Sequence, residues 1–460
     1  MTKTERIVAD LRRRIEEGAL PVGARLPSIR RAAEEFGVSK NTAVEAYDRL
    51  VSLGLVTARQ GAGFTVAAAG REARGEAAPR HLVDAVDSVS LLRAQLDQNY
   101  EMRVGDGRPP ASWMQGVVPK RTFGASTEAI ADSSGYGSPK GYSGLRDMIA
   151  ARHRAQNIAL DPEQIVTTFG ANHALDLIVR RYLAPGDTVL VDDPGYYPLF
   201  AKLKVAQVRY VGVRRLANGP DLEDLRAKAA SERPALFFTQ SLAQNPTGSS
   251  MDLACAHGVL QAAETFGFRV VDDDPFVDLP GARGVRLAAL DQFRNVIFVG
   301  TFSKTLSASF RSGYIAAAPE IVDKLAELKM ITVVNSSRFS ELLIADMIHN
   351  RRYQKHLKRV AGRIDEAARQ LAAGLAGLGL TTLAPPGHGY YTYLQLPEGW
   401  SDLEFAQAAA RDSIFLAPGT VFAVDEAGHR PGLRINIARA GDPRFLRFLR
   451  KTLSGVGRSG

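Results

Sequence analysis

Apolar residues early in the chain recur every three or four positions on a charged background, a spacing that predicts helices. Three such stretches, separated by Gly and Pro, occupy residues 4–17, 28–36 and 40–53. Two short runs of strand-forming residues then flank the turn Gln60-Gly61-Ala62-Gly63, which predicts a hairpin. Three helices followed by a hairpin indicate a winged helix-turn-helix over residues 1–66.

The pattern changes after this unit. Residues 67–95 are small, charged and without hydrophobic periodicity, so we interpret them as a flexible linker. Over residues 96–460, short apolar runs alternate with helical stretches, at 164–168, 188–191, 208–213, 235–239, 269–271 and 295–299. This alternation predicts an α/β domain with a mostly parallel sheet. A smaller C-terminal α+β subdomain is predicted by a long charged helix at 350–378 and strands at 390–396 and 433–438.

Composition narrows the class of protein. A chain of 460 residues is too long for one core and indicates two or three domains. Its hydrophobic content of 45%, with no run of 18 apolar residues, is typical of a soluble globular protein without a membrane span. The first residues lack the apolar core of a signal peptide, and Cys255 is the only cysteine, which excludes an internal disulfide and fits a reducing cytoplasm. The net charge of +9 permits nucleic-acid binding.

The helix starts of the N-terminal unit carry residue types that contact double-stranded DNA. A recognition helix places its first residues against base edges, while its surroundings hold phosphates. The candidates are Ser28, Arg30 and Arg31 at the second helix, Ser39, Lys40, Asn41 and Thr42 at the third, and Arg59 on the wing. Any one of them alone is equally well explained as a solvated helix end. Residues 1–66 hold 11 Lys or Arg and 8 Asp or Glu, a balance of 11 − 8 = +3, so local placement must supply the affinity.

One segment further along combines a lysine with groups suited to a phosphate. Lys304 lies in Gly300-Thr301-Phe302-Ser303-Lys304-Thr305-Leu306, and Arg311 follows seven residues later. A lysine amine forms a Schiff base with an aldehyde, while nearby hydroxyls and an arginine can hold a phosphate. Pyridoxal 5'-phosphate (PLP) is the cofactor that carries both groups.

Other candidates for the same site follow predicted strands in order. Phe169-Gly170-Ala171-Asn172 opens a helix, where backbone N–H groups can approach a phosphate. Tyr196 can stack on a pyridine ring, and Asn245 can donate to a phenolic oxygen. A carboxylate of the strand end Asp272-Asp273-Asp274 can keep the ring nitrogen protonated. Each signal alone is common structural punctuation. Their combination and order point to one site.

The N-terminal unit contains four ordered segments, Leu26-Pro27-Ser28-Ile29-Arg30, Gly37-Val38-Ser39-Lys40-Asn41-Thr42, Gly54-Leu55-Val56 and Gly61-Ala62-Gly63-Phe64-Thr65-Val66. Together they closely resemble the GntR family of winged-helix transcription regulators. The resemblance covers the whole unit and implies binding to an operator.

From about residue 100 to 455 the chain resembles the fold-type I, class I aminotransferases. The resemblance implies that Lys304 holds PLP as an internal aldimine, and that Asp273, Asn245 and Tyr196 take the roles given above. It also implies a phosphate cradle made of Gly170, Ala171, Asn172, Thr301, Ser303 and Arg311. Arg434, in Gly432-Leu433-Arg434-Ile435-Asn436, matches the arginine that pairs with a substrate α-carboxylate. The alternative for Arg434 is a structural salt bridge.

Two positions depart from the aminotransferase pattern. The family has Asp-x-x-Tyr, whose tyrosine hydroxyl also binds the phenolic oxygen, and this chain has Phe276 there. The segment after the lysine usually contains a proline, and this chain has Ala308. Both changes are compatible with PLP binding and argue against brisk transamination.

The fusion of the two parts resembles the MocR subfamily of bacterial regulators. That resemblance implies a homodimer, head-to-tail, with each DNA-binding unit docked on the partner's PLP domain. It implies that an amine or amino-acid effector is sensed as an external aldimine that shifts the protein between two arrangements. Two alternatives remain: an active PLP-dependent aminotransferase with an appended DNA-binding domain, and a GntR-type repressor whose second domain binds no cofactor.

Overall fold

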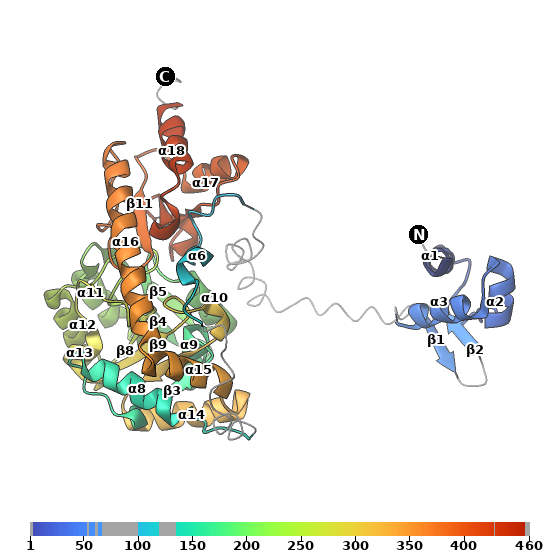
Figure 1. Cartoon of the computed structure of the whole chain (residues 1–460), viewed down its shortest axis with the longest axis horizontal. Helices are drawn as coiled ribbons and strands as arrows, with labels where there is room; N and C mark the ends of the chain where they lie inside the picture. Colours follow the sequence, from blue (N-terminus) through green and yellow to red (C-terminus); the bar gives the residue numbers. More distant parts are fainter. Residues whose placement is uncertain are drawn as a thin grey trace. The chain divides into compact units, whose positions relative to one another are not determined.

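The N-terminal and C-terminal parts of the computed structural model form separate units, Met1–Arg80 and His81–Gly460 (Figure 1). The structure describes residues 3–52, 55–59, 63–66, 100–118, 135–426 and 428–455. The predicted linker at 67–95 lies outside these ranges. Each unit has its own hydrophobic core.

The N-terminal unit is a three-helix bundle with a hairpin. Its elements are α1 (Lys3–Glu16), α2 (Ile29–Phe36), α3 (Lys40–Ser52), β1 (Val56–Arg59) and β2 (Gly63–Val66). The two strands are antiparallel, with Val56 opposite Val66. Leu11, Tyr47 and Leu50 face one buried cluster because their spacing places them on the inner faces of α1 and α3. The predicted winged helix-turn-helix is confirmed.

An eight-stranded sheet forms the centre of the C-terminal unit, in the order β3-β10-β9-β8-β7-β4-β5-β6. Its strands are β3 (Ile165–Thr168), β4 (Thr188–Asp193), β5 (Arg209–Leu216), β6 (Gly219–Pro220), β7 (Leu236–Thr239), β8 (Arg269–Asp274), β9 (Val296–Thr301) and β10 (Gly313–Ala316). Neighbouring strands from β9 to β5 are parallel, whereas β10 is antiparallel to both β3 and β9. The mostly parallel sheet is therefore confirmed.

Helices cover both faces of this sheet (Figure 1). In β9, Val296 and Phe298 pack into one cluster, while Ile297 and Val299 pack into the other. A strand buried on both faces needs apolar residues at every position, which is why the parallel strands are continuous apolar runs. The covering helices are α8 (Ser143–Arg154), α9 (Ala171–Tyr182), α10 (Tyr197–Val205), α11 (Leu222–Glu232), α12 (Leu253–Phe266), α13 (Leu287–Asp291), α14 (Pro319–Val333) and α15 (Arg338–His349).

A smaller subdomain follows at the C-terminal end. It contains the antiparallel sheet β11-β13-β12, helices at its surface and the end of the long helix α16. Its elements are α16 (Arg352–Ala376), β11 (Tyr391–Gln395), α17 (Asp402–Arg411), β12 (Ala417–Pro418), β13 (Gly432–Asn436) and α18 (Pro443–Gly455). Met102 and Val104, which precede the short helix α6 (Ala111–Met114), also belong to its core. Among the described residues, none of the helices has both the length and the apolar character that a membrane span requires.

Parallel strands that share a direction end at the same edge of a sheet, so the residues that follow them gather there. Tyr196 follows β4, Asn245 follows β7, Asp273 lies at the end of β8, and Lys304 follows β9. The fold thus positions side chains that are more than 100 residues apart in the sequence around one edge.

Candidate functional site

Asp273 is a buried carboxylate with one satisfied oxygen. Its Oδ2 accepts a hydrogen bond from Gln240 Nε2 at 2.8 Å, whereas Oδ1 is buried and has no partner among the described residues. Burial raises the pKa of Asp273 to about 7, and the charges of Asp272 and Asp274 add to this effect. Gln240 and Lys304 act in the opposite direction. The free oxygen is therefore a place for a donor, and a cationic donor would relieve the cost of burying the charge.

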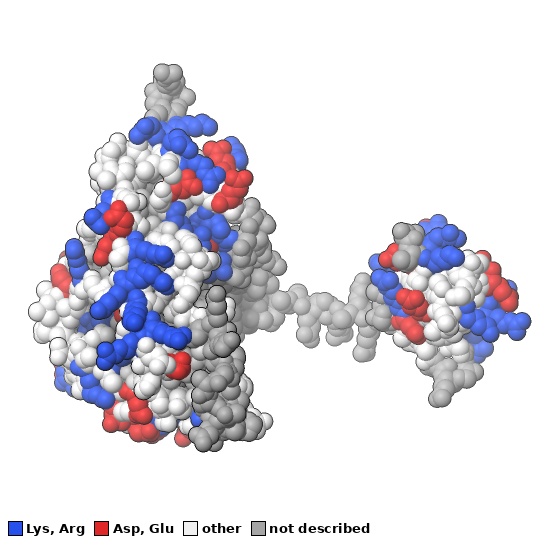
Figure 2. Space-filling model, viewed as in Figure 1, with Lys and Arg blue, Asp and Glu red and all other residues white. Residues whose placement is uncertain are grey.

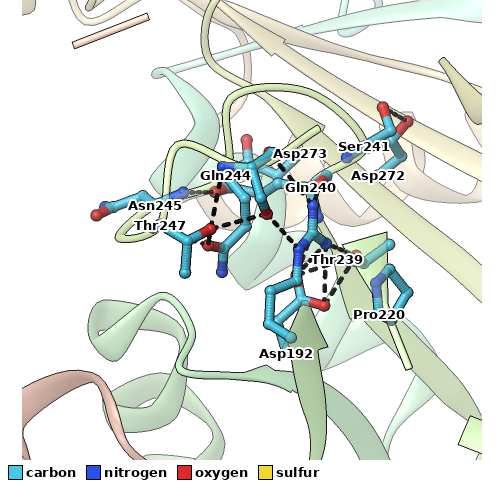
Figure 3. A network of polar contacts seen from close by, with 12 residues as sticks. Asp192, Pro220, Thr239, Gln240, Ser241, Gln244, Asn245, Thr247, Asp272 and Asp273 are labelled. Carbon is cyan, nitrogen blue, oxygen red and sulfur yellow. Dashed lines mark hydrogen bonds and ion pairs between the residues drawn. The ribbon is translucent and has the colours of Figure 1, made fainter. Parts of the chain in front are cut away.

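Gln240 connects Asp273 to the loop that carries Asn245 (Figure 3). The Gln240 Oε1 accepts from the Asn245 backbone N–H at 2.6 Å. Beneath this loop, Arg215 pairs with Asp192 at 3.1 Å, and both side chains are almost fully buried. Arg215 also donates to Gln240 O at 2.9 Å and to Ser249 Oγ at 2.8 Å, on either side of Asn245, so this buried ion pair holds the loop that carries Asn245.

Arg434 is a buried cation that pairs with no carboxylate among the described residues. Its side chain is 1% exposed and lies between the rings of Tyr391 and Phe422. Nη1 donates to Asn245 Oδ1 at 3.1 Å and Nη2 to Gly105 O at 2.6 Å, while Nε has no partner among the described residues. Both acceptors are neutral, so the salt-bridge alternative finds no carboxylate within the described part of the chain. A guanidinium in this state can receive a ligand carboxylate on two parallel N–H groups.

Lys304 lies next to this group. Its Nζ donates to Gly107 O at 2.6 Å, and the same carbonyl accepts from the Tyr391 hydroxyl at 2.8 Å. The backbone carbonyl of Lys304 accepts from the Tyr390 hydroxyl at 2.9 Å. The Lys304 amine is therefore held by a neutral carbonyl and not by a carboxylate. Tyr391, which binds the same carbonyl, also contacts the Arg434 guanidinium through its ring.

The residues predicted to hold a phosphate lie at or after the ends of β3 and β9, which both pair with β10. Gly313 pairs with Thr168 in β3 and with Thr301 in β9, which brings the start of α9 beside the segment that contains Ser303. Arg311 Nη2 donates to Phe169 O at 2.8 Å, and a Cβ on Gly170 would lie only 3.3 Å from this Nη2 atom. Gly170 has φ +83°, a conformation that favours glycine.

The remaining members of the cradle lie around this contact. Ala171 and Asn172 lie in the first turn of α9. The backbone N–H groups of a first helical turn have no partner within the helix and can bind a phosphate. The Thr301 hydroxyl donates to Ser303 Oγ at 3.1 Å. Donors from the α9 start, Arg311 and two hydroxyls thus gather in the arrangement that suits a phosphate.

Tyr196 and Phe276 have different surroundings. Tyr196 lines one cavity together with Gln240 and Asp273, and burial raises the pKa of its hydroxyl, which keeps it protonated. Phe276 is fully buried and packs edge-on against Tyr390 and Tyr391. Because the hydroxyls of Tyr390 and Tyr391 donate to carbonyls, neither replaces the donor that Phe276 lacks.

The candidate DNA contacts lie at the exposed starts of α2 and α3. The Ser28 hydroxyl accepts from Arg31 N at 3.3 Å and the Ser39 hydroxyl accepts from Thr42 N at 3.2 Å, so both serines act as helix caps. Arg31, Lys40 and Asn41 are exposed, and Arg30 forms only a surface pair with Glu34 at 3.4 Å. The side chain of Arg59 lies outside the described residues.

Three site residues were not identified from the sequence. Gln240, Gly107 and Tyr391 bridge the predicted residues, as described above. Gln240 had a usable signal, because it is a polar residue directly after the buried strand β7, as Asp273 is at the end of β8. Gly107 had none, since its role depends on a backbone carbonyl.

Comparison with known proteins gives the same division of the chain. Residues 101–450 match the family profile of aminotransferase class I and II, and residues 3–66 match that of bacterial regulatory proteins of the gntR family. The chain is 28% identical to the uncharacterized HTH-type transcriptional regulator YdcR of Escherichia coli (strain K12), over 93% of each chain. It is 29% identical to the probable rhizopine catabolism regulatory protein MocR of Rhizobium meliloti, over 76% of this chain and 72% of that one.

A solved structure agrees in fold. LysN, an alpha-aminoadipate aminotransferase from Thermus thermophilus complexed with N-(5'-phosphopyridoxyl)-L-leucine, superposes with a TM-score of 0.69 at 25% identity. The match covers 81% of this chain and 97% of that chain.

The raised pKa of Asp273 predicts a pH-dependent stability in the protein without cofactor. Folded Asp273 keeps a proton that the unfolded chain releases at its ordinary pKa, so this contribution to stability is lost as pH rises towards about 7. Asp273→Asn removes the ionisable group and with it this loss of stability. The unfolding free energy of the variant should exceed that of the wild type by on the order of 1–3 kcal/mol at about pH 8, and by less at about pH 5. Denaturant unfolding at both pH values measures it. Identical pH dependence in the two proteins would refute the assignment.

Proposed function

Because the chain belongs to the aminotransferase class I and II family over residues 101–450 and matches the gntR regulators over residues 3–66, we propose that it is a PLP-dependent transcriptional regulator of the MocR type. In this proposal residues 1–66 bind operator DNA, residues 67–95 link, and residues 96–460 bind the cofactor and an amine effector. The strongest support is that two buried charged groups each keep one polar atom, Asp273 Oδ1 and Arg434 Nε, with no partner among the described residues, in a chain whose α3 begins with the exposed residues Lys40 and Asn41.

The residues around Lys304 fit PLP. Asp273 Oδ1 is a buried acceptor suited to a protonated ring nitrogen, and Tyr196 lines the same cavity as Asp273. Asn245 follows β7 at the same edge of the sheet. The phosphate would be held by Gly170, Ala171, Asn172, Thr301, Ser303 and Arg311. When bound, PLP supplies an aldehyde that condenses reversibly with primary amines and a ring that withdraws electrons. Lys304 supplies the amine that attaches it.

The effector is proposed to carry a primary amine and a carboxylate. Lys304 and the cofactor select the amine, while Arg434 offers the matched pair of donors for a carboxylate. Binding such a ligand would replace the contacts of Arg434 with Asn245 Oδ1 and Gly105 O. A ligand that changes these contacts in one arrangement more than in another shifts the balance between arrangements.

Sensing is favoured over turnover by Phe276. In the aminotransferase pattern the tyrosine at this position donates a hydrogen bond to the phenolic oxygen, and a phenyl ring has no such donor. The rival function, an active aminotransferase with an appended DNA-binding domain, is favoured by the presence of both Lys304 and Asp273. Single-turnover conversion of the cofactor to its pyridoxamine form by a panel of amino acids separates the two functions. Rapid, complete conversion would favour the enzyme.

A homodimer is supported by an exposed apolar patch at the end of α14. The patch consists of Met330, Ile331, Val333 and Val334, and Ile331 is 79% exposed. Contiguous apolar residues on a surface mark an interaction site. The resemblance to MocR regulators predicts that the dimer is head-to-tail, with each DNA-binding unit docked on the partner's PLP domain.

Attachment of the cofactor is expected to require Lys304. Borohydride reduction of the PLP-saturated protein should leave a mass adduct on the peptide that contains Lys304. Lys304→Ala should abolish both this adduct and the absorbance of the attached cofactor, with unchanged far-UV circular dichroism. An adduct at a different lysine would refute the role of Lys304.

DNA binding is expected to depend on the start of α3. Lys40→Ala should weaken binding by about tenfold to a duplex that the wild type selects from a random-sequence library, because it removes one direct contact. Arg13→Ala on α1, which removes an exposed arginine 64% accessible to solvent, is the matched control and should bind as the wild type does. Fluorescence anisotropy measures both. Equal losses in the two variants would argue against α3 as the recognition helix.

Dimerisation is expected to depend on Ile331. Ile331→Asp places a charge in the apolar patch and should weaken self-association by roughly 3 kcal/mol or more, since each copy loses a buried isoleucine side chain. Leu253→Asp, at a position that is 60% exposed on α12, is the control and should leave self-association unchanged. Sedimentation velocity of both variants reports the result. A dimer of unchanged stability in Ile331→Asp would exclude this patch.

A further inference from the structure

The first half of α16 carries positive charge that the fold does not neutralise. Residues 347–364 hold six Lys or Arg and no Asp or Glu, which are Arg351, Arg352, Lys355, Lys358, Arg359 and Arg363. All six are exposed, and we call them the α16 basic face. Figure 2 shows Lys and Arg side chains gathered where α16 crosses the C-terminal unit in the view of Figure 1.

The stability of the helix does not explain these residues. The opposite side of α16, with Tyr353, Leu357 and Val360, packs into the core and fixes the basic side outward. The N-terminal end of a helix favours negative charge, yet the first turn of α16 contains no acidic residue. Like charges three or four positions apart also repel, as at Lys355 and Arg359. The fold therefore bears this charge at a cost.

No carboxylate in the described residues pairs with any of the six side chains. Arg359 Nη2 donates to Gln115 O at 2.9 Å, and Arg363 Nη1 donates to Ser112 O at 3.2 Å, so their partners are neutral. Arg352, Lys355 and Lys358 point their charge to solvent. The face thus retains its full charge for an external partner.

We propose that the α16 basic face binds the phosphate backbone of DNA, as a second contact beside the winged helix. This inference rests on the proposed function, because it assumes that the chain binds DNA. The N-terminal unit has a net charge of only 11 − 8 = +3, whereas the α16 segment contributes +6. Sequence-independent affinity for DNA comes from such phosphate contacts.

The dimensions agree with a DNA backbone. From Arg352 to Arg363 the helix rises about 16 Å, which corresponds to about five base pairs along a duplex. Residues 67–99 separate the two described units in the sequence, and 33 residues span at most about 110 Å when fully extended. A reach of about 110 Å corresponds to about 32 base pairs at roughly 3.4 Å per pair, so a duplex of about 80 base pairs is long enough for both contacts.

The experiment measures binding to a mixed-sequence duplex of about 80 base pairs, because phosphate contacts do not depend on sequence. The test variant is R352Q/K355Q/K358Q in the full chain, and its salt dependence is followed by fluorescence anisotropy. The logarithmic slope should become shallower by about 2 to 3, and the affinity at moderate salt should fall by about tenfold. The melting temperature should not fall, since the substitutions relieve repulsion within α16.

The matched control removes the same charge elsewhere on this unit. K324Q/R411Q/R450Q neutralises three exposed side chains on α14, α17 and α18 and should keep the wild-type slope. Equal slopes and affinities for the test and control variants would overturn the inference, and would leave an acidic protein as the partner of this face. Failure to bind the duplex by the wild type at low salt would overturn it as well.

Lys40→Ala separates this inference from the proposed function. The variant should keep the part of the salt slope that depends on α16, because the two contacts lie on different units. If Lys40→Ala binds any duplex as the wild type does while R352Q/K355Q/K358Q is impaired, the role of the winged helix fails and the α16 contact stands. If R352Q/K355Q/K358Q binds as the wild type does while Lys40→Ala is impaired, the α16 contact is excluded and the role of the winged helix stands.

Discussion

The buried carboxylate of Asp273 is the constraint on which the proposed cofactor site of the C-terminal unit depends. A parallel sheet with helices on both faces leaves its strand ends as the place where polar side chains can meet. Asp273 lies there with one oxygen bound to Gln240 and the other without a partner among the described residues, at a position where burial opposes its ionisation. A cationic group on the free oxygen would remove that penalty, which makes the site one that is completed by a ligand.

Arg434 has the same character with the opposite sign. It is held between two aromatic rings and, within the part of the chain that the structure describes, bonded only to neutral oxygens. Asn245 contacts Arg434 through its side chain and Gln240 through its backbone, so the carboxylate and the guanidinium are joined by one short path. A ligand that pairs with Arg434 would therefore disturb the loop that also supports Asp273. This connection gives the proposed sensor a physical means to register its effector.

The sequence predicted the architecture because each element follows from a local rule. The capped helices α2 and α3, the apolar runs of the parallel strands and the MocR-type domain order are confirmed. Strand β10 was not predicted, because Gly313 to Ala316 is short and its antiparallel pairing depends on β3 and β9, which are distant in sequence. Gly107 was missed for another reason, because the role of a backbone carbonyl leaves no signature in the sequence. The roles given to Lys304, Arg434 and the α3 residues stay predictions.

We propose that one chain couples an amine-binding site to a DNA-binding surface. The most direct measurement titrates the PLP-loaded protein with single amino acids and follows cofactor absorbance and operator affinity in the same samples. We expect at least one amino acid to change both the absorbance and the operator affinity with a common midpoint, and the operator affinity to shift by about fivefold or more. Absorbance changes that leave operator affinity constant for every amino acid that binds would contradict it.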